Sequence, residues 1–262
     1  MEEGPRPVKT TKTSMQIVEA IKQRNGATLT EIAGEINIAK STVHNHLNTL
    51  LNQGYLVREG DVYHVGLKLL ELGEHARTRR SIYEHAQEEV YTLASATNEE
   101  ADFTVEENGR VYTLEYALGN TDVTTPQTGS DFLQRGSSFY THNCASGKAI
   151  LATFPDHKIE EIIDKYGLPA TTEKTITDKG KFLTEIKETK QRGYAINDEE
   201  LQKGYRAVAM AIQDSDETTL GALCVGGPTY RFEIEGPRFE QIISQLVQRK
   251  ERLEEKIQNS VE

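Results

Sequence analysis

The residue types best suited to chemistry are two cysteines, several histidines and the Gly-Lys pair at residues 147–148. Gly147-Lys148 has the ending of a phosphate-binding loop, but such a loop needs a glycine five residues before Gly147 and a serine or threonine after Lys148. Those two positions hold His142 and Ala149. The pair is therefore not interpreted as a nucleotide site.

The cysteines are candidates for a nucleophile or a redox pair. Cys144 has His142 nearby in the sequence, but no acidic partner can be identified. Neither Cys-x-x-Cys, His-Glu-x-x-His nor Gly-x-Ser-x-Gly occurs. A metal site would need a fold that brings together four distant residues, namely His142, Cys144, His157 and Cys224. We predict ordinary buried cysteines, no catalytic residue, no metal and no cofactor, and hence a protein that is not an enzyme.

A different chemistry is indicated by one face of a helix predicted at residues 40–53. At 100° per residue, Val43, Leu47 and Leu50 fall on its buried side. The other side and its flanks carry short polar groups suited to base edges and phosphates, and the predicted DNA contacts are Lys40, Ser41, Thr42, Asn45 and His46. No Asp or Glu occurs between residues 36 and 58, so nothing in this stretch repels phosphate.

The elements around this helix have their own start and stop signals. A first helix is predicted to begin near Ser14 and to end at Asn25-Gly26. The second begins at Thr28, which forms the spacing of a capping box with Glu31. The order is helix, helix, turn, helix and then a hairpin over residues 55–65. This order predicts a winged helix-turn-helix.

The hairpin adds one more predicted DNA contact. Arg58 precedes the turn Glu59-Gly60-Asp61, where a wing can contact a backbone phosphate or the minor groove. As a lone arginine it is equally compatible with an ordinary surface position. Lys9 and Lys12, in the segment before the first helix, are expected to add attraction to phosphates.

We expect four segments along the chain: a flexible arm at 1–13, the winged helix-turn-helix at 14–66, a linker helix at 67–81 and a second domain at 82–262. In the last segment, strand-like runs and amphipathic helices follow one another. This pattern predicts an antiparallel sheet flanked by helices, so the predicted fold class is α+β.

The charge distribution agrees with this division. The 262 residues carry a net charge of −11, but residues 1–80 contain 11 Lys/Arg against 9 Asp/Glu, so the negative charge lies in the remainder. A mildly basic first third suits DNA, and an acidic second part suits solvation. Two distant cysteines set no disulfide framework, and neither a signal peptide nor a membrane span is evident, so a cytoplasmic location is expected.

Several phrases of the sequence resemble one known family. In the first domain they are Leu29-Thr30-Glu31-Ile32-Ala33, residues 39–44 and residues 50–56. In the second domain they are residues 145–152, Thr175-Ile176-Thr177, Gly193-Tyr194-Ala195, Asp198-Glu199-Glu200 with Gly204, and residues 222–228. With these phrases in this order, the chain resembles the IclR family of bacterial and archaeal transcriptional regulators over nearly its whole length.

The resemblance implies a GAF-like effector-binding domain, and a homodimer or homotetramer that binds double-stranded DNA at palindromic operators. It also implies an effector pocket on one side of the second sheet, lined by Ala145, Ser146, Asn197, Ala207, Cys224 and Gly226. The chain departs from the family where Asn45 replaces a common arginine, and where Cys224 and Gly226 replace small hydroxyl residues.

The chemistry of these positions points to a small-molecule effector. Cys224 and Gly226 are two apart on a strand and share one face. Asn197 can donate and accept hydrogen bonds, which suits a hydroxyl beside a carboxylate. A small organic, sugar or aromatic acid is therefore expected. Two alternatives stay open, namely an architectural DNA-binding protein without a ligand and a thiol-dependent enzyme on a GAF-like domain.

Overall fold

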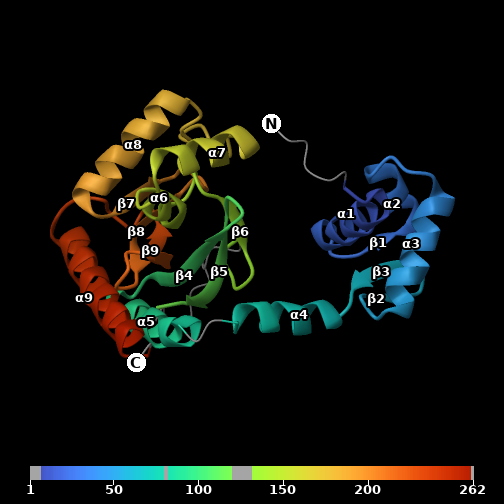
Figure 1. Ribbon diagram of the computed structural model, residues 1–262, viewed down its shortest axis with the longest axis horizontal. Helices are drawn as coiled ribbons and strands as arrows, with labels where there is room; N and C mark the ends of the chain where they lie inside the picture. Colours follow the sequence, from blue (N-terminus) through green and yellow to red (C-terminus); the bar gives the residue numbers. More distant parts are fainter. Residues whose placement is uncertain (1–6, 80–81, 120–131, 261–262) are drawn as a thin grey trace. The chain divides into compact units, whose positions relative to one another are not determined.

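The computed structural model describes residues 7–79, 82–119 and 132–260 (Figure 1). The chain divides into two compact units, residues 1–79 and residues 80–262. In the described parts of both units, no helix is long and apolar enough to cross a membrane.

The first unit combines helices with a small antiparallel sheet. Its helices are α1 (Lys9–Gln23), α2 (Leu29–Glu35), α3 (Lys40–Asn52) and α4 (Lys68–Arg77), and its strands are β1 (Ala27–Thr28), β2 (Leu56–Glu59) and β3 (Val62–Val65). Strand β3 lies between β1 and β2, and it pairs antiparallel with both. The predicted winged helix-turn-helix is confirmed.

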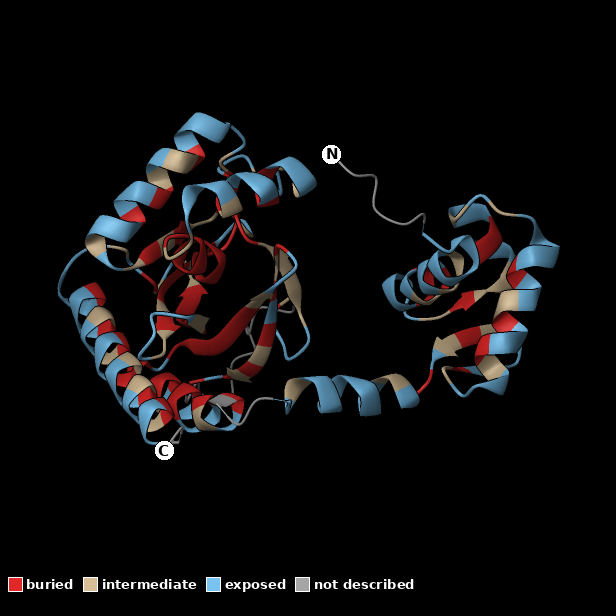
Figure 2. Cartoon of the chain, in the orientation of Figure 1, coloured by how far each residue is buried: buried red, intermediate tan, exposed pale blue. Residues whose placement is uncertain are grey.

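Local sequence signals explain these elements. The Thr28 side chain accepts a hydrogen bond from the Glu31 backbone N–H, and the Glu31 carboxylate accepts one from the Thr28 N–H at 2.8 Å, so α2 begins with the predicted capping box. Ile17 of α1 and Val43 and Leu47 of α3 are fully buried in one core. The buried side chains of α1 and α3 therefore follow the helical period (Figure 2).

The first helix begins earlier than expected. Residues 9–13, predicted to belong to a flexible arm, form the first turns of α1. Of the predicted arm, residues 1–6 lie outside the described part. These turns contain Lys and Thr and no apolar period, so the sequence offers no packing signal there. Extending an existing helix adds one hydrogen bond per residue, which explains why α1 continues to Lys9 without burial.

The predicted linker helix at 67–81 corresponds to α4, which ends at Arg77. Residues 80 and 81 lie outside the described part. Within the first unit, α4 buries none of its residues, and Leu67 and Leu70 are 81% and 59% exposed.

The second unit contains a six-stranded sheet in which every pair is antiparallel. Its strands are β4 (Glu100–Glu107), β5 (Arg110–Ala117), β6 (Ser138–Tyr140), β7 (Ala195–Asp198), β8 (Tyr205–Gln213) and β9 (Thr219–Pro228). Their order across the sheet is β6-β5-β4-β9-β8-β7. The α+β class predicted from the sequence is confirmed.

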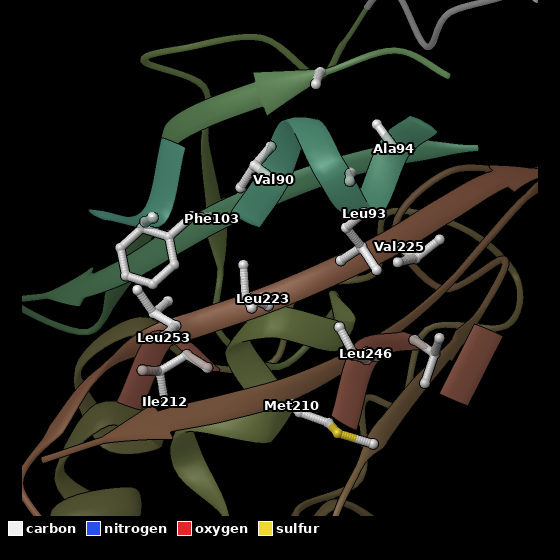
Figure 3. Close-up of a cluster of buried hydrophobic side chains, with 14 of the residues drawn as sticks. Val90, Leu93, Ala94, Phe103, Met210, Ile212, Leu223, Val225, Leu246 and Leu253 are labelled. Atoms are coloured by element: carbon white, nitrogen blue, oxygen red, sulfur yellow. The ribbon is translucent and has the colours of Figure 1, made fainter. Parts of the chain in front are cut away.

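Helices cover both faces of this sheet (Figure 1). They are α5 (Ile82–Thr97) and α9 (Pro237–Ser260) on one face, and α6 (Ala145–Leu151), α7 (Asp156–Tyr166) and α8 (Lys179–Arg192) on the other side. Figure 3 shows Phe103, Met210 and Leu223 of the sheet packed with Leu246 and Leu253 of α9.

Successive residues of each strand face opposite sides of the sheet. On β9, Leu223 and Val225 join the core with α5 and α9, whereas Ala222 and Cys224 belong to the cluster under α6. One face of the sheet is therefore a large apolar core. The other is a floor of small side chains beneath α6.

Candidate functional site

The polar face of α3 is exposed to solvent. Its side chains at the predicted DNA-contact positions are Lys40, Ser41, Thr42 and Asn45. Val43 and Leu47, on the opposite side, are fully buried and fix the rotation of the helix. The exposed face carries donors and acceptors and no carboxylate, which suits base edges and phosphate oxygens.

His46 is the predicted DNA contact that turns back toward its own domain. Its side chain is half-buried, and Nδ1 lies 2.8 Å from Oγ of Ser14 on α1. The helical projection assigns His46 to a flank of α3, and in the structure that flank packs against α1. The ring is therefore placed to fix the packing of α3 on α1.

Arg58 lies on β2 beside the turn of the hairpin. Its Nε donates to the carbonyl oxygen of Gly60 at 2.7 Å, and its guanidinium is 2.9 Å from the Asp61 carboxylate. The guanidinium also lies 5.5 Å from the ring centroid of Tyr63. A phosphate at this position would compete with Asp61 for the arginine.

A cavity lies between the small-residue face of the second sheet and α6. Its volume is about 20 Å³, room for about one water molecule. Its walls mix apolar and polar groups: Asp102, Thr104, Val111, Thr113, Leu133, Phe139, Cys144, Ala145, Ser146, Asn197, Leu201, Tyr205, Ala207 and Cys224. A larger ligand would need these walls to move apart.

Most of the predicted effector positions meet in this cavity. Ala145, Ser146, Asn197, Ala207 and Cys224 all line it. Gly226 does not line it, because a Cβ at that residue would lie 2.2 Å from the hydroxyl oxygen of Tyr205. The space that Gly226 leaves is thus occupied by a tyrosine side chain.

Three polar atoms of the cavity wall have no hydrogen-bond partner within the described residues. They are Thr113 Oγ1, Asn197 Nδ2 and the Tyr205 hydroxyl, and all three are shielded from solvent. The side-chain oxygen Oδ1 of Asn197, by contrast, accepts from the backbone N–H groups of Glu200 and Leu201. An unpaired buried donor is costly and rare. These atoms make the cavity the candidate site for a polar ligand.

The cavity floor also holds a carboxyl group that the sequence analysis did not identify. Asp102 is 3% exposed and accepts a hydrogen bond from the Thr104 hydroxyl at 2.5 Å. Burial raises the pKa of Asp102 from 3.8 to about 6, although hydrogen bonds from Thr104 and Cys224 oppose this shift. A sequence signal existed, since Asp102 and Thr104 alternate with the apolar residues Ala101, Phe103 and Val105.

Both cysteines are free, buried and part of the cavity wall. Burial raises the pKa of the Cys144 thiol to about 12, and it raises the pKa of Cys224 well above its usual value. The backbone N–H of Gly147 donates to Cys144 Sγ at 3.4 Å, so this sulfur caps α6. Neither group is a thiolate near neutral pH, which argues against thiol catalysis.

The Gly-Lys pair has a structural role. A Cβ at residue 147 would lie 2.2 Å from the carbonyl oxygen of Thr141, so only glycine permits this close packing. Lys148 is 1% exposed, and its Nζ lies 2.6 Å from Glu200 and 3.4 Å from Glu185. The lysine therefore ties α6 to α8 and to the segment after β7. No group of three His, Cys, Asp or Glu residues suited to a metal ion occurs in the described parts of the chain.

Comparison with known protein families finds two matches. Residues 14–60 match the IclR helix-turn-helix domain, and residues 74–251 match the bacterial transcriptional regulator IclR C-terminal domain. The matched families consist of transcriptional regulators and not of enzymes.

Individual proteins are similar over most of their length. The probable HTH-type transcriptional regulator ArcR of Halobacterium salinarum is 29% identical over 230 residues, which cover 87% of this chain and 86% of the relative. The HTH-type transcriptional regulator BhcR of Paracoccus denitrificans is 30% identical over 222 residues, or 83% of this chain and 77% of the relative.

Solved structures share the fold. An IclR transcriptional regulator from Alicyclobacillus acidocaldarius has a TM-score of 0.78 at 22% identity, over 95% of this chain and 98% of that one. An IclR homolog from Microbacterium hydrocarbonoxydans, complexed with 4-hydroxybenzoate, has a TM-score of 0.76 at 18% identity, over 94% and 97% of the two chains.

Proposed function

Because the chain belongs to the IclR family of transcriptional regulators, with a helix-turn-helix for DNA and an effector-binding C-terminal domain, we propose that a small organic, sugar or aromatic acid controls its affinity for an operator. The observation that carries this proposal is the cavity under α6, where Thr113, Asn197 and Tyr205 keep polar atoms without partners. A ligand oxygen would satisfy these groups. The complex of one structural relative with 4-hydroxybenzoate supports an acid of this size.

The first test is operator release by metabolites. DNA recovered with the protein by immunoprecipitation identifies an operator, and binding of that operator is then measured in the presence of a panel of acids. An effector lowers operator affinity or raises it, and it raises the melting temperature of the protein by mass action. An architectural protein without a ligand would show neither response to any compound.

Variants of the cavity wall sharpen this test. Tyr205→Phe removes an unpartnered hydroxyl and should leave stability equal or higher, while it weakens the response to the effector. Ala207→Trp puts a side chain much larger than the cavity into its wall, where Ala207 is buried, and so blocks the site. An effector that binds both variants as tightly as the native chain would place its site elsewhere.

On the DNA side, we propose that Ser41, Thr42 and Asn45 set the sequence preference. Lys40 and Arg58 would add phosphate contacts, and His46 would act mainly through its contact with Ser14. The support for this assignment is that these side chains lie on the exposed face of α3, which carries no acidic group. Base contacts discriminate between sequences, whereas phosphate contacts strengthen binding to all of them.

The proposed binding unit is at least a dimer on a palindromic operator. One recognition helix reads only a short site, and two copies would place two helices at successive turns of DNA. The leucines exposed on α4 offer apolar surface for a second copy, within residues 67–98. Light scattering that shows a monomer at micromolar concentration, together with full operator affinity, would contradict this proposal.

A further inference from the structure

The floor of the cavity holds one acid, Asp102, among otherwise uncharged side chains of the described lining. Asp102 on β4 pairs across the sheet with Cys224 on β9, which in turn pairs with Ala209 on β8. Thr104, two residues along β4, faces the same side and donates to Asp102. The carboxyl group is thus directed to the face covered by α6, where it lines the cavity.

No cation lines the described part of this cavity. Lys148, the buried lysine of α6, is paired with Glu200 and Glu185 and does not reach the cavity lining. Among the titratable neighbours of Asp102, Cys224, Tyr205 and Cys144 are neutral at physiological pH because burial raises their pKa values. Tyr116 pairs with Asp102 from β5, and Glu100, two residues along β4, faces the same side of the sheet. A carboxylate without a cationic partner in such a place needs hydrogen-bond donors.

At the other end of the cavity, the unpartnered atom is a donor. Asn197 Nδ2 belongs to β7, which is three strands away from β4. Three strand spacings amount to roughly 14 Å between the backbones. The cavity therefore offers an acceptor at Asp102 and a donor at Asn197, at separate positions.

We propose that Asp102 makes this cavity selective for a hydroxylated ligand, whose hydroxyl group donates a hydrogen bond to the Asp102 carboxylate. The cavity walls move apart to admit this ligand, and an acceptor oxygen of it, such as that of a carboxylate, lies toward Asn197. The inference rests on the proposed effector function and assigns its ligand class. A ligand carboxylate faces away from Asp102, because two like charges in a buried site repel each other.

The test compares matched pairs of probes on the full-length protein by calorimetry. The pairs are 4-hydroxybenzoate with benzoate, and gluconate with hexanoate. At least one hydroxylated member should bind the native chain tenfold or more tightly than its deoxy partner, because a missing hydroxyl leaves the buried carboxylate without its donor.

Two substitutions assign that preference to Asp102. Asp102→Leu removes the acceptor and should reduce the preference below threefold, whereas Asp102→Asn keeps one acceptor oxygen and should retain part of it. Asp164→Asn, at an exposed acid of α7, is the matched control and should change nothing. Circular dichroism of each variant confirms that it is folded.

The proposal is overturned if the deoxy probes bind the native chain as tightly, if the preference survives Asp102→Leu, or if no hydroxylated probe binds. Operator release by a compound without a hydroxyl group would overturn the hydroxyl requirement and leave the proposed effector function standing. If no compound of a wide metabolite panel binds or releases the operator, the effector function itself fails.

Discussion

The hydroxyl of Tyr205 occupies the space that a side chain at Gly226 would need. A Cβ at residue 226 would lie 2.2 Å from the Tyr205 hydroxyl oxygen and 2.7 Å from its Cζ. The same ring packs edge-on against Phe132, with 5.1 Å between the ring centroids. The glycine on β9 therefore sets the position of a tyrosine on β8, which forms one wall of the cavity.

From this relationship we expect Gly226→Ala to destabilise the second domain by about 1–3 kcal/mol, because the tyrosine must leave its position. Urea unfolding measures the effect. In a Tyr205→Ala background the cost of Gly226→Ala should largely vanish, which gives a coupling energy between the two residues. Gly34→Ala in α2, where an added Cβ meets nothing within 4 Å, is the control and should be neutral or stabilising. Equal stability of Gly226→Ala and the native chain would contradict the prediction.

The buried ion pair between Lys148 and Glu200 leads to a second prediction. Lys148→Met should cost about 3–5 kcal/mol, because it leaves the buried Glu200 carboxylate without its cation. The double variant Lys148→Met with Glu200→Gln should recover much of this loss. Lys179→Met removes an exposed pair with Asp164 and should cost at most about 1 kcal/mol. Chemical denaturation of the four proteins is the measurement, and a loss below 1 kcal/mol for Lys148→Met would be the contrary result.

The third prediction separates base contacts from phosphate contacts. Asn45→Ala should cost about 1–3 kcal/mol at one base pair of the operator and leave other positions unaffected. Helix α3 should persist, since the Thr49 hydroxyl bonds the Asn45 backbone carbonyl, which the substitution keeps. Lys12→Ala should weaken all sequences alike and reduce the salt dependence by about one charge.

Titrations of single-base operator variants at several salt concentrations distinguish the two substitutions. If Asn45→Ala keeps both the preferred sequence and the affinity, another residue of α3 reads the base. If Lys12→Ala changes the preferred sequence, the lysine contributes more than phosphate attraction.

The winged helix-turn-helix was predictable because its signals are local. The capping box at Thr28 and the apolar spacing of Val43, Leu47 and Leu50 each specify an element within a few residues. His46 shows the limit of this approach, since a helical projection cannot tell which flank another helix covers.

The cavity was predictable only in part. The resemblance to a family predicted Ser146, Asn197, Ala207 and Cys224. These residues lie on α6, β7, β8 and β9, four segments that meet only in the folded domain. Tyr205 was missed because its role depends on the strand pairing that places it over Gly226, and such long-range register has no local sequence signal.

The last prediction concerns Asp102 and pH. Burial raises the pKa of Asp102 in the folded chain to about 6, above its ordinary value of 3.8. An acid whose pKa is raised in the folded chain stabilises the fold fully at pH values below its unfolded pKa. This contribution is lost as the pH rises through the folded pKa. Between about pH 4 and pH 6 the native chain should therefore lose stability through this residue, up to about 3 kcal/mol. Other carboxylates change the stability with pH as well, but their contribution is the same in the native chain and in its variants.

The difference in stability between Asp102→Asn and the native chain isolates the effect of Asp102, since asparagine still accepts from Thr104 but carries no charge. Urea unfolding at pH 4.5, 6 and 8 should show Asp102→Asn gaining stability relative to the native chain as pH rises, with the largest gain at pH 8. Asp164→Asn should show no such trend, because its side chain is 73% exposed. A stability difference for Asp102→Asn that does not change with pH would mean that Asp102 has an ordinary pKa, and that its carboxylate is stabilised by a partner other than Thr104 and Cys224.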